Sequence, residues 1–303
     1  MNREPASLIL ARQTLLAALG LAGSGRQRYA AAMTLFNAGK MDDQALEIYR
    51  ICSPLDQEDP APLLAAAGLA APAHPDESDL GRGLRLKTLL AECDRYLASL
   101  SGPGIAEVRA GLAPSLAARA EPLLRPSGGA NVVLADHLGA ALTALEATHP
   151  ELAQAIAIAA ADLEWITYGE YPPDEIGTDF LTGHAYAEMV GPEGPLFAED
   201  YDLGIFLIAP DVLYRDHHHP APELYAPLTG PHGWRFGQND PLTIKPAHVP
   251  VWNPPNAPHM TKVGPLPFLC IFGWTKDVQL PAKVLPAGDW PELEKLRIAP
   301  EQS

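Results

Sequence analysis

Cysteine is scarce in this chain, and its spacing excludes a disulfide scaffold. The 303 residues include three cysteines, Cys52, Cys93 and Cys270, which lie far apart in apolar runs and form no C-x-x-C pair. Disulfide-stabilised secreted domains carry a denser and more regular set of cysteines. We therefore expect three buried free thiols, a reducing compartment and a cytoplasmic protein.

Positive charge is also scarce. The chain has 21 Lys and Arg residues against 37 Asp and Glu residues, which gives a formal net charge of -16. Nucleic acids and anionic lipid surfaces are bound through basic patches, so the sequence argues against both partners. The total charge does not identify a small-molecule substrate, because a local site can oppose the overall field.

Long hydrophobic runs are missing as well. No uninterrupted apolar stretch reaches the roughly 18 residues that a membrane-spanning helix requires. The apolar residues 15–22 follow Arg3 in the manner of a signal peptide, but Glu4, Arg12 and Gln13 precede them and no A-x-A cleavage site follows. We expect no transmembrane helix, and these interruptions argue against a signal peptide, with secretion as the alternative.

The first half of the chain has the periodicity of helices. Residues 84–100 carry the clearest stripe, with leucines and a cysteine on one face and charged residues on the other. Asp42 stands where it can cap a helix over residues 42–52. Further helices are predicted near residues 8–19, 29–38, 63–69, 105–120, 135–147 and 150–164, and a loop over 71–79.

The composition changes near Tyr168. Beyond it, short runs rich in Val, Ile, Phe, Tyr and Trp alternate with Pro and Gly, which predicts many short strands. The strands are expected near 181–190, 201–208, 224–228, 234–236, 242–244, 249–252 and 268–274. We predict an α+β protein in which a helical region, 1–166, packs on a β-barrel domain, 167–303.

A histidine-rich motif lies inside the predicted barrel. His217, His219, Glu223 and Gly230 form the pattern H-x-H-x3-E-x6-G. Side chains two residues apart on a strand point to the same face, so the two imidazoles and the carboxylate can converge. Such a set suits a divalent metal, and His259, after a Pro-rich turn, is the candidate fourth ligand. The alternative interpretation is a polar loop or an adventitious histidine tract.

The motif resembles that of the cupins, which have a double-stranded β-helix (jelly-roll) fold. The later run Pro254-Pro255-Asn256-Ala257-Pro258-His259 is similar to the second cupin motif, P-x-G-x2-H. Two glycines of the cupin pattern are replaced here, one by Asp211 and one by Asn256, a residue that also tolerates a left-handed turn. The resemblance covers roughly residues 175–280.

A narrower resemblance is to bacterial dimethylsulfoniopropionate (DMSP) lyases of the cupin class. Tyr225 stands two residues after Glu223, Tyr214 stands five before His219, and Trp274 lies on the last barrel strand, as in that family. The resemblance implies β-elimination of DMSP to acrylate and dimethyl sulfide, with Tyr225 as the base and Tyr214 as a second catalytic residue. It also implies one divalent ion, Fe²⁺, Mn²⁺, Zn²⁺ or Ni²⁺, held by the three histidines and Glu223.

The sulfonium group of such a substrate calls for aromatic faces. Trp274, Trp234, Trp252 and Tyr214 are the candidates for this cation–π contact, although each could equally be plain core. Two other functions remain open on the sequence: a cupin Fe(II) dioxygenase, and a non-catalytic cupin that binds a small ligand. We expect a small-molecule substrate, and a homodimer is compatible with the sequence.

Overall fold

The computed structural model describes Leu8, Ala11, Thr14, Leu15 and residues 24–53, 60–69, 77–117, 131–169, 171–238 and 240–299. The chain divides into two compact units, Met1–Gly81 and Arg82–Ser303. Most of the helix predicted over 8–19 and of the loop predicted over 71–79 lies outside the described residues. No helix in the described part of the chain is both long and apolar enough to span a membrane.

The first unit is helical. It contains α2 (Ser24–Asn37), α3 (Asp43–Cys52) and α4 (Ala61–Ala66). The side chain of Asp42 accepts a hydrogen bond from the Ala45 backbone N–H at 2.7 Å, which confirms the predicted helix cap. Leu35, Cys52 and Leu64 are buried in its core, so Cys52 is a buried free thiol.

The second unit contains the remaining helices and all the strands of the described chain. Its helices are α5 (Glu77–Ser99), whose first residues precede the division, α6 (Ile105–Ala117), α7 (Val132–Glu146), α8 (Pro150–Ala159), η1 (Ala160–Asp162), α9 (Pro173–Ile176), α10 (Thr178–Thr182) and α11 (Trp290–Lys295). Its strands are β1 (His184–Gly191), β2 (Leu196–Phe197), β3 (Asp202–Ile208), β4 (Leu213–His218), β5 (Glu223–Pro227), β6 (His232–Arg235), β7 (Thr243–Lys245), β8 (Val251–Asn253), β9 (His259–Lys262), β10 (Phe268–Trp274) and β11 (Lys283–Val284).

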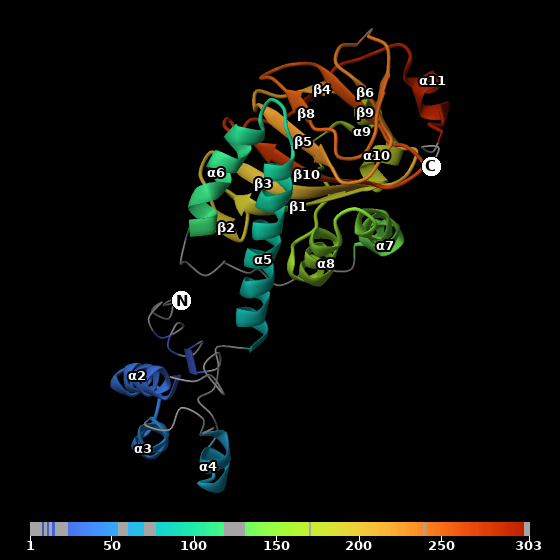
Figure 1. Ribbon diagram of the computed structural model, residues 1–303. Helices are drawn as coiled ribbons and strands as arrows, with labels where there is room; N and C mark the ends of the chain where they lie inside the picture. The colour runs from blue at the N-terminus through green and yellow to red at the C-terminus, as the bar shows by residue number, and fades with distance from the viewer. Residues whose placement is uncertain are drawn as a thin grey trace. The chain divides into compact units, whose positions relative to one another are not determined.

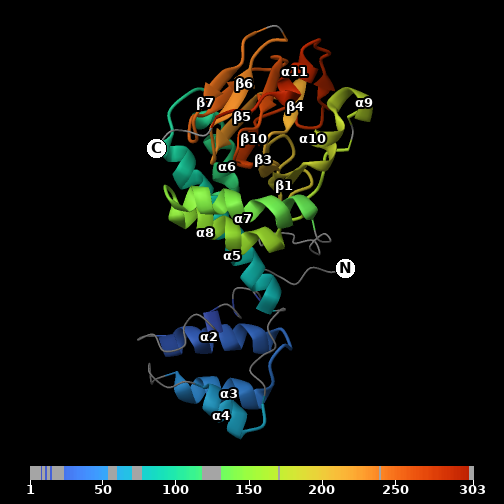
Figure 2. The same cartoon turned by 90° about the vertical axis from the view of Figure 1, so that its right-hand side faces the viewer.

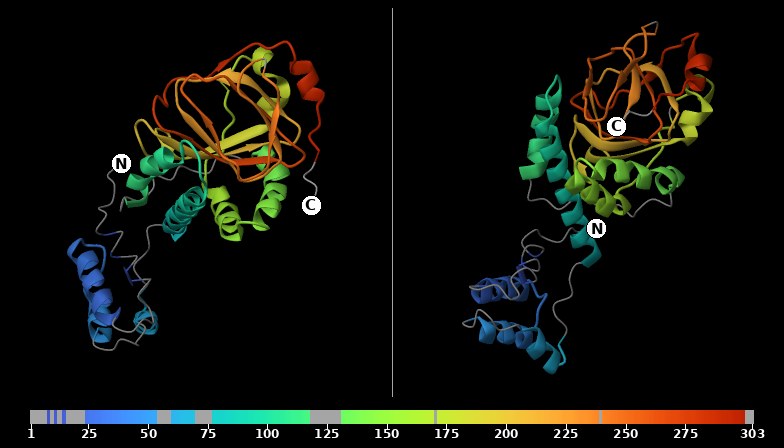
Figure 3. Two further views of the ribbon diagram at one scale, coloured as in Figure 1. Left: turned by 45° about the horizontal axis from the view of Figure 1, so that its top comes forward. Right: turned by 45° about the vertical axis from the view of Figure 1, so that its right-hand side comes forward.

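The strands form two sheets that face each other (Figure 3). One has the order β2-β1-β3-β10-β5-β8 and the other β11-β4-β9-β6-β7, with every pair antiparallel except β1 and β2. This is the double-stranded β-helix expected of a cupin. The ladders of the described strands do not close into one barrel, because Pro-containing segments without a full set of N–H donors carry the chain between the sheets.

The six-stranded sheet is buried on both faces. Its outer face packs against α5, α7 and α8, and Leu89, Ile156 and Ile205 belong to the one continuous apolar core that results. Figures 1 and 2 show these helices along the outside of β1 and β3. The inner face carries a second, aromatic core that includes Phe206 and Phe272. Alternation along each strand thus separates an aliphatic face from an aromatic one.

The unit boundary lies earlier than the boundary predicted from composition. The predicted division at 166/167 marks where helices give way to strands, but helices α5 to α8 share their core with the sheet. The division into compact units falls at Gly81 and Arg82. The helices of residues 82–166 therefore belong to the same compact unit as the strands.

Two turns adopt the left-handed backbone that the cupin pattern normally assigns to glycine. Asp211 has φ 65° and Asn256 has φ 58°. Asp and Asn tolerate this conformation better than other residues with a Cβ. The replacements therefore preserve the turns, as the sequence predicted for Asn256.

We predict that Gly104→Ala destabilises the second unit. Gly104 precedes α6 with φ +80°, and a Cβ there would lie 2.0 Å from the Trp252 ring, so both strain and a clash oppose the change. The expected loss is about 1–3 kcal/mol of unfolding free energy, measured by denaturant titration. Gly139→Ala, within α7 and open on all sides, is the control and should leave stability equal or higher. Equal stability of the two variants would contradict the prediction.

Candidate metal centre and adjoining cavity

The metal-ligand motif lies where the chain crosses from one sheet to the other. His217 is in β4, and His219 and Glu223 flank the crossing to β5 at 220–222. The return crossing leads from β8 to His259 at the start of β9, which pairs with His217 in the ladder. One nitrogen each of His217, His219 and His259 lies within 4.8 Å of the others, and all three residues are buried.

Each imidazole is oriented by a hydrogen bond from its Nδ1 to a backbone carbonyl. His217 bonds Arg215 O at 2.8 Å, His219 bonds Ala221 O at 2.8 Å and His259 bonds Ala257 O at 2.9 Å. A carbonyl oxygen only accepts, so each Nδ1 carries the hydrogen. In the neutral ring the Nε2 atom is then an unprotonated lone pair available to a metal.

Two of these Nε2 atoms, those of His217 and His259, are buried without a hydrogen-bond partner among the described residues. Burial lowers the pKa of His217 well below its ordinary value, and the two neighbouring imidazoles lower it further, so the ring is neutral. Buried polar atoms normally have partners. A divalent cation would satisfy both nitrogens, so the donor set fits a metal of the kind bound by imidazole.

Glu223 approaches this group of histidines from the opposite sheet. Its Oε2 lies 3.2 Å from His219 Nε2 and 3.3 Å from His259 Nε2. Burial alone would raise the pKa of Glu223, but the neighbouring imidazoles lower it well below the ordinary value, so it is a carboxylate. His219 Nε2 lies within hydrogen-bond distance of this oxygen, and a divalent cation between the carboxylate and the imidazoles would take the place of a shared proton. Asn253 Nδ2 and Trp274 Nε1 donate to this carboxylate at 3.2 and 2.8 Å and hold it in place.

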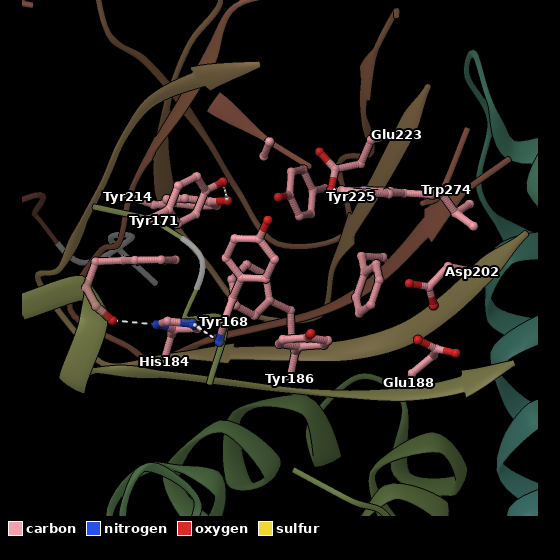
Figure 4. A pocket seen from close by; sticks show the side chains of 15 residues that line it. Tyr168, Tyr171, His184, Tyr186, Glu188, Asp202, Tyr214, Glu223, Tyr225 and Trp274 are labelled. Carbon is pink, nitrogen blue, oxygen red and sulfur yellow. Dashed lines mark hydrogen bonds between the residues drawn. The ribbon is translucent and has the colours of Figure 1, made fainter. Parts of the chain in front are cut away.

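A cavity of about 190 Å³ adjoins the centre and extends along the inner face of the six-stranded sheet (Figure 4). Aromatic rings make up most of its wall, and three carboxylates enter it, those of Glu188, Asp202 and Glu223. No Lys or Arg is among the described residues that line it. This wall therefore attracts cationic and apolar groups and offers no side-chain cation to a carboxylate.

Trp274 connects the centre to the far end of the cavity. Its backbone pairs with Glu223 on one side and with Asp202 on the other, so the three side chains share one row of the inner face. The indole stacks on the His219 ring at 4.4 Å between centroids. Trp274 is therefore part of the cavity wall.

Two tyrosines predicted to be catalytic also line the cavity. Tyr225 lies two residues beyond Glu223 on β5 and points into the same space. Burial raises the pKa of Tyr225 well above its ordinary value, and the Glu223 carboxylate raises it further. Tyr214 stacks on His217 at 3.9 Å, and its hydroxyl meets that of Tyr171 at 2.7 Å. Without a cation both tyrosines are neutral phenols.

Comparison with known proteins places the chain in a family. A family model described as dimethylsulfoniopropionate lyase matches residues 110–270, which is more than half of the chain. The chain belongs to the DMSP lyase family. The match includes every residue of the proposed metal set, His217, His219, Glu223 and His259, and ends at Cys270 in β10, before Trp274.

Individual proteins that the chain resembles share only a third or less of its residues in the matched region. The chain is 32% identical over 142 residues to DddL of Cereibacter sphaeroides, which is named as a candidate DMSP lyase; the match covers 46% of this chain and 57% of that protein. A chain from the crystal structures of the DMSP lyases RdDddP and RnDddQII has a TM-score of 0.51 and 23% identity, over 67% of this chain and 98% of its own length. DddQ from Ruegeria pomeroyi DSS-3 has a TM-score of 0.49 and 20% identity, over 66% and 96%. The first of these structures supports the shared fold.

Two of the predicted substrate-binding tryptophans lie elsewhere. Trp252 pairs with Leu224 on the outer side of the sheet and packs against the helical core, because alternation on β8 turns it away from its neighbours Val251 and Asn253. Trp234 faces inward but is 1% exposed and is packed behind Tyr225, at 5.7 Å between ring centroids. Neither is among the residues that line the cavity.

The sequence prediction also missed part of the cavity wall. Tyr171, Tyr186, His184 and Asp202 line it but belong to no motif. His184 is held by Phe180 O and by the Tyr168 backbone N–H, and burial lowers its pKa to about 4, so it is a neutral structural residue. The one sequence feature that could have identified Tyr186 and Asp202 is the alternation of side chains on β1 and β3, which places both on the inner face.

A buried ion network supports the back of β4. Arg235 of β6 donates two hydrogen bonds to Asp216, at 3.0 and 2.5 Å, and Trp290 Nε1 of α11 donates to the same carboxylate at 2.8 Å. Asp216 precedes His217 and points to the opposite face. The strand β11 also pairs with β4, where Val284 lies opposite His217. The C-terminal segment thus fixes the strand that carries the first ligand.

We predict that His219→Ala and His259→Ala weaken divalent metal binding by at least about 10–100-fold, because each removes a converging Nε2 donor. Metal content after equilibrium dialysis, measured by mass spectrometry, is the readout. His218→Ala is the matched control from the same histidine run: His218 is partly exposed and outside the converging group, so this variant should retain the metal. Full occupancy in His259→Ala would remove that residue from the site.

We also predict that Arg235→Met destabilises the second unit by about 3–5 kcal/mol, because it leaves the Asp216 carboxylate buried without its main cation. Denaturant unfolding monitored by tryptophan fluorescence measures the loss. Arg95→Met, which removes an exposed i,i+3 partner of Glu92 on α5, is the control and should unfold close to the parent midpoint. If Arg235→Met and Arg95→Met have the same unfolding midpoint, the proposed support of β4 by Arg235 is wrong.

Proposed function

We propose that the protein is a metal-dependent lyase that cleaves DMSP, or a closely similar small acid, into dimethyl sulfide and acrylate. The observation that carries the proposal is the convergence of three buried imidazoles and Glu223 at one end of an aromatic cavity. DMSP has a carboxylate at one end and a cationic dimethylsulfonium at the other. The family membership supports the substrate class.

The carboxylate of the substrate finds no Lys or Arg among the described residues of the cavity wall. A divalent ion held by His217, His219, His259 and Glu223 would supply the positive charge that binds this carboxylate, acidifies the α-carbon and stabilises a nearby phenolate. The chain's own contribution is the orientation of the four donors, through the carbonyl contacts of the histidines and the two donors to Glu223.

Tyr225 is the proposed base. It shares the strand face of Glu223 and enters the cavity beside it. Its phenolate oxygen takes the α-proton, the C–H electron pair forms the new carbon–carbon double bond, and the carbon–sulfur pair leaves with sulfur as neutral dimethyl sulfide. The proton then passes from Tyr225 to solvent, so no oxidant or reductant is consumed. Because burial raises the pKa of Tyr225, this role depends on the cation beside it.

Tyr214 is a positioning residue in this scheme. Its ring is stacked on His217, and its hydroxyl is paired with that of Tyr171, so it braces a ligand while facing the cavity. Trp274 supplies the aromatic face for the sulfonium and at the same time holds Glu223. The aromatic wall limits the access of water to the reacting atoms.

We predict that Tyr225→Phe lowers the release of dimethyl sulfide from DMSP by about 100-fold or more while the protein keeps its metal. Headspace gas chromatography of the purified, metal-loaded protein under anaerobic conditions measures the reaction, which requires no oxygen. Tyr29→Phe, on α2 and outside the cavity, is the control and should match the parent. Parent-level activity of Tyr225→Phe would show that another group is the base, and a parent inactive with every divalent ion tested would contradict the proposed function.

A further inference from the structure

Two carboxylates, those of Asp202 and Glu188, line the cavity on the side of Trp274. Figure 4 shows them near each other, on the side of the cavity where Trp274 lies. Asp202 pairs with Trp274 across the strands, and Trp274 pairs with Glu223. Adjacent strands are about 4.8 Å apart, so Asp202 lies roughly 10 Å from Glu223 along one row.

The two carboxylates differ in how they are held. Glu188 Oε1 accepts the backbone N–H of Glu193 at 2.8 Å. Asp202 Oδ1 is buried and has no hydrogen-bond partner among the described residues. A buried carboxylate oxygen without a partner is costly, which indicates that a cationic group belongs beside it. In the described part of the chain no Lys or Arg lines this cavity, so the cation is left to a ligand.

The protonation of Asp202 is linked to that cation. Burial raises the pKa of Asp202 well above its ordinary value, and the carboxylates of Glu188 and Glu223 raise it further. A cation bound beside Asp202 favours the ionised form and opposes all three effects. The protein's own groups therefore disfavour the charge on Asp202, and a cationic ligand would favour it.

The surroundings suit a cation without N–H groups. Phe272, Tyr186 and Trp274 present rings to the same part of the cavity. Gly204 of β3 pairs with Glu188 on one side and with Phe272 on the other. A Cβ at Gly204 would lie 2.5 Å from the Phe272 ring, so the absence of a side chain lets that ring lie over β3. Ring faces and carboxylates attract a methylated cation through charge alone.

We propose that Asp202, assisted by Glu188, is the specificity-determining residue that recognises the cationic end of the substrate. The inference rests on the proposed function and adds to it a selection for sulfonium over neutral thioether acids. The cavity is then polarised end to end, with a metal for the substrate carboxylate and an anion for its sulfonium. The aromatic faces alone, which the sequence suggested, would bind both kinds of sulfur group.

The charge of Asp202 favours the bound substrate more than the transition state. As the carbon–sulfur bond breaks, the sulfonium becomes neutral dimethyl sulfide and its attraction to Asp202 disappears. An interaction that is strongest in the ground state lowers KM without raising kcat. Asp202→Asn is therefore expected to raise KM for DMSP about tenfold and to leave kcat equal or higher. In the parent, the disappearance of the attraction when the carbon–sulfur bond breaks also assists release of dimethyl sulfide.

The test compares two ligands that share a carboxylate and a two-carbon chain. DMSP carries a positive sulfur, and 3-(methylthio)propionate carries a neutral one. Their dissociation constants are measured by calorimetry on metal-loaded parent, Asp202→Asn, Glu188→Gln and the control Glu199→Gln. Glu199 is exposed and outside the cavity, so its variant makes the same change in net charge. For the DMSP titrations, the parent and each variant also carry Tyr225→Phe, which prevents turnover during the measurement.

We expect the parent to prefer DMSP, Asp202→Asn to lose about tenfold of that preference, Glu188→Gln to lose part of it and Glu199→Gln to keep it. Binding of the thioether should change little in any variant. An unchanged preference in both cavity variants, or no preference in the parent, would overturn the inference. Turnover of the parent is scored separately, so a protein that prefers DMSP yet releases no dimethyl sulfide would refute the proposed reaction and leave the recognition intact.

Discussion

The structure depends on one electrostatic constraint: three imidazole nitrogens and a carboxylate oxygen face one another in a buried space. Each histidine donates its Nδ1 hydrogen to a backbone carbonyl, so its Nε2 atom is the one that faces the site, where a proton and a metal ion compete for the same lone pair. Lone pairs and an anion repel one another, and burial removes the water that would otherwise separate them. A bound cation would remove this repulsion. The surrounding elements hold the donor atoms close together and so keep the site ready for the cation.

That arrangement explains several features that are remote from the ligands. The two sheets must face each other because β4 and β9 supply the imidazoles and β5 the carboxylate. The Pro-containing crossings bring those strand ends together. Arg235, Asp216 and Trp290 brace the back of β4, while β11 pairs along its edge. The helical core on the outer face leaves the inner face free to be aromatic, which suits the proposed sulfonium substrate.

The sequence was more informative about the residue types at the site than about the strands that carry them. Alternation accounts for His217 and His219, which lie two residues apart, whereas Glu223 approaches them from β5 of the other sheet and His259 from β9. The strands that bear these histidines, β4 and β9, were absent from the strands predicted by composition, since polar residues mask their β pattern. Trp252 was assigned to the pocket because the pairing register, which turns it outward, is a tertiary property. Asp202 could not be singled out, since its role arises from its position beside Trp274 in the ladder.

The helical half shows the same limit. Periodicity predicted α5, α7 and α8, but only packing reveals that they share a core with the strands and that the unit boundary falls near Gly81. The most direct test of the account is an anomalous difference map from crystals of the protein loaded with a divalent transition metal. The account predicts one strong peak about 2.0–2.2 Å from the Nε2 atoms of His217, His219 and His259, with a Glu223 oxygen beside it. A peak on the Nδ1 side of these rings, or away from Glu223, would contradict it.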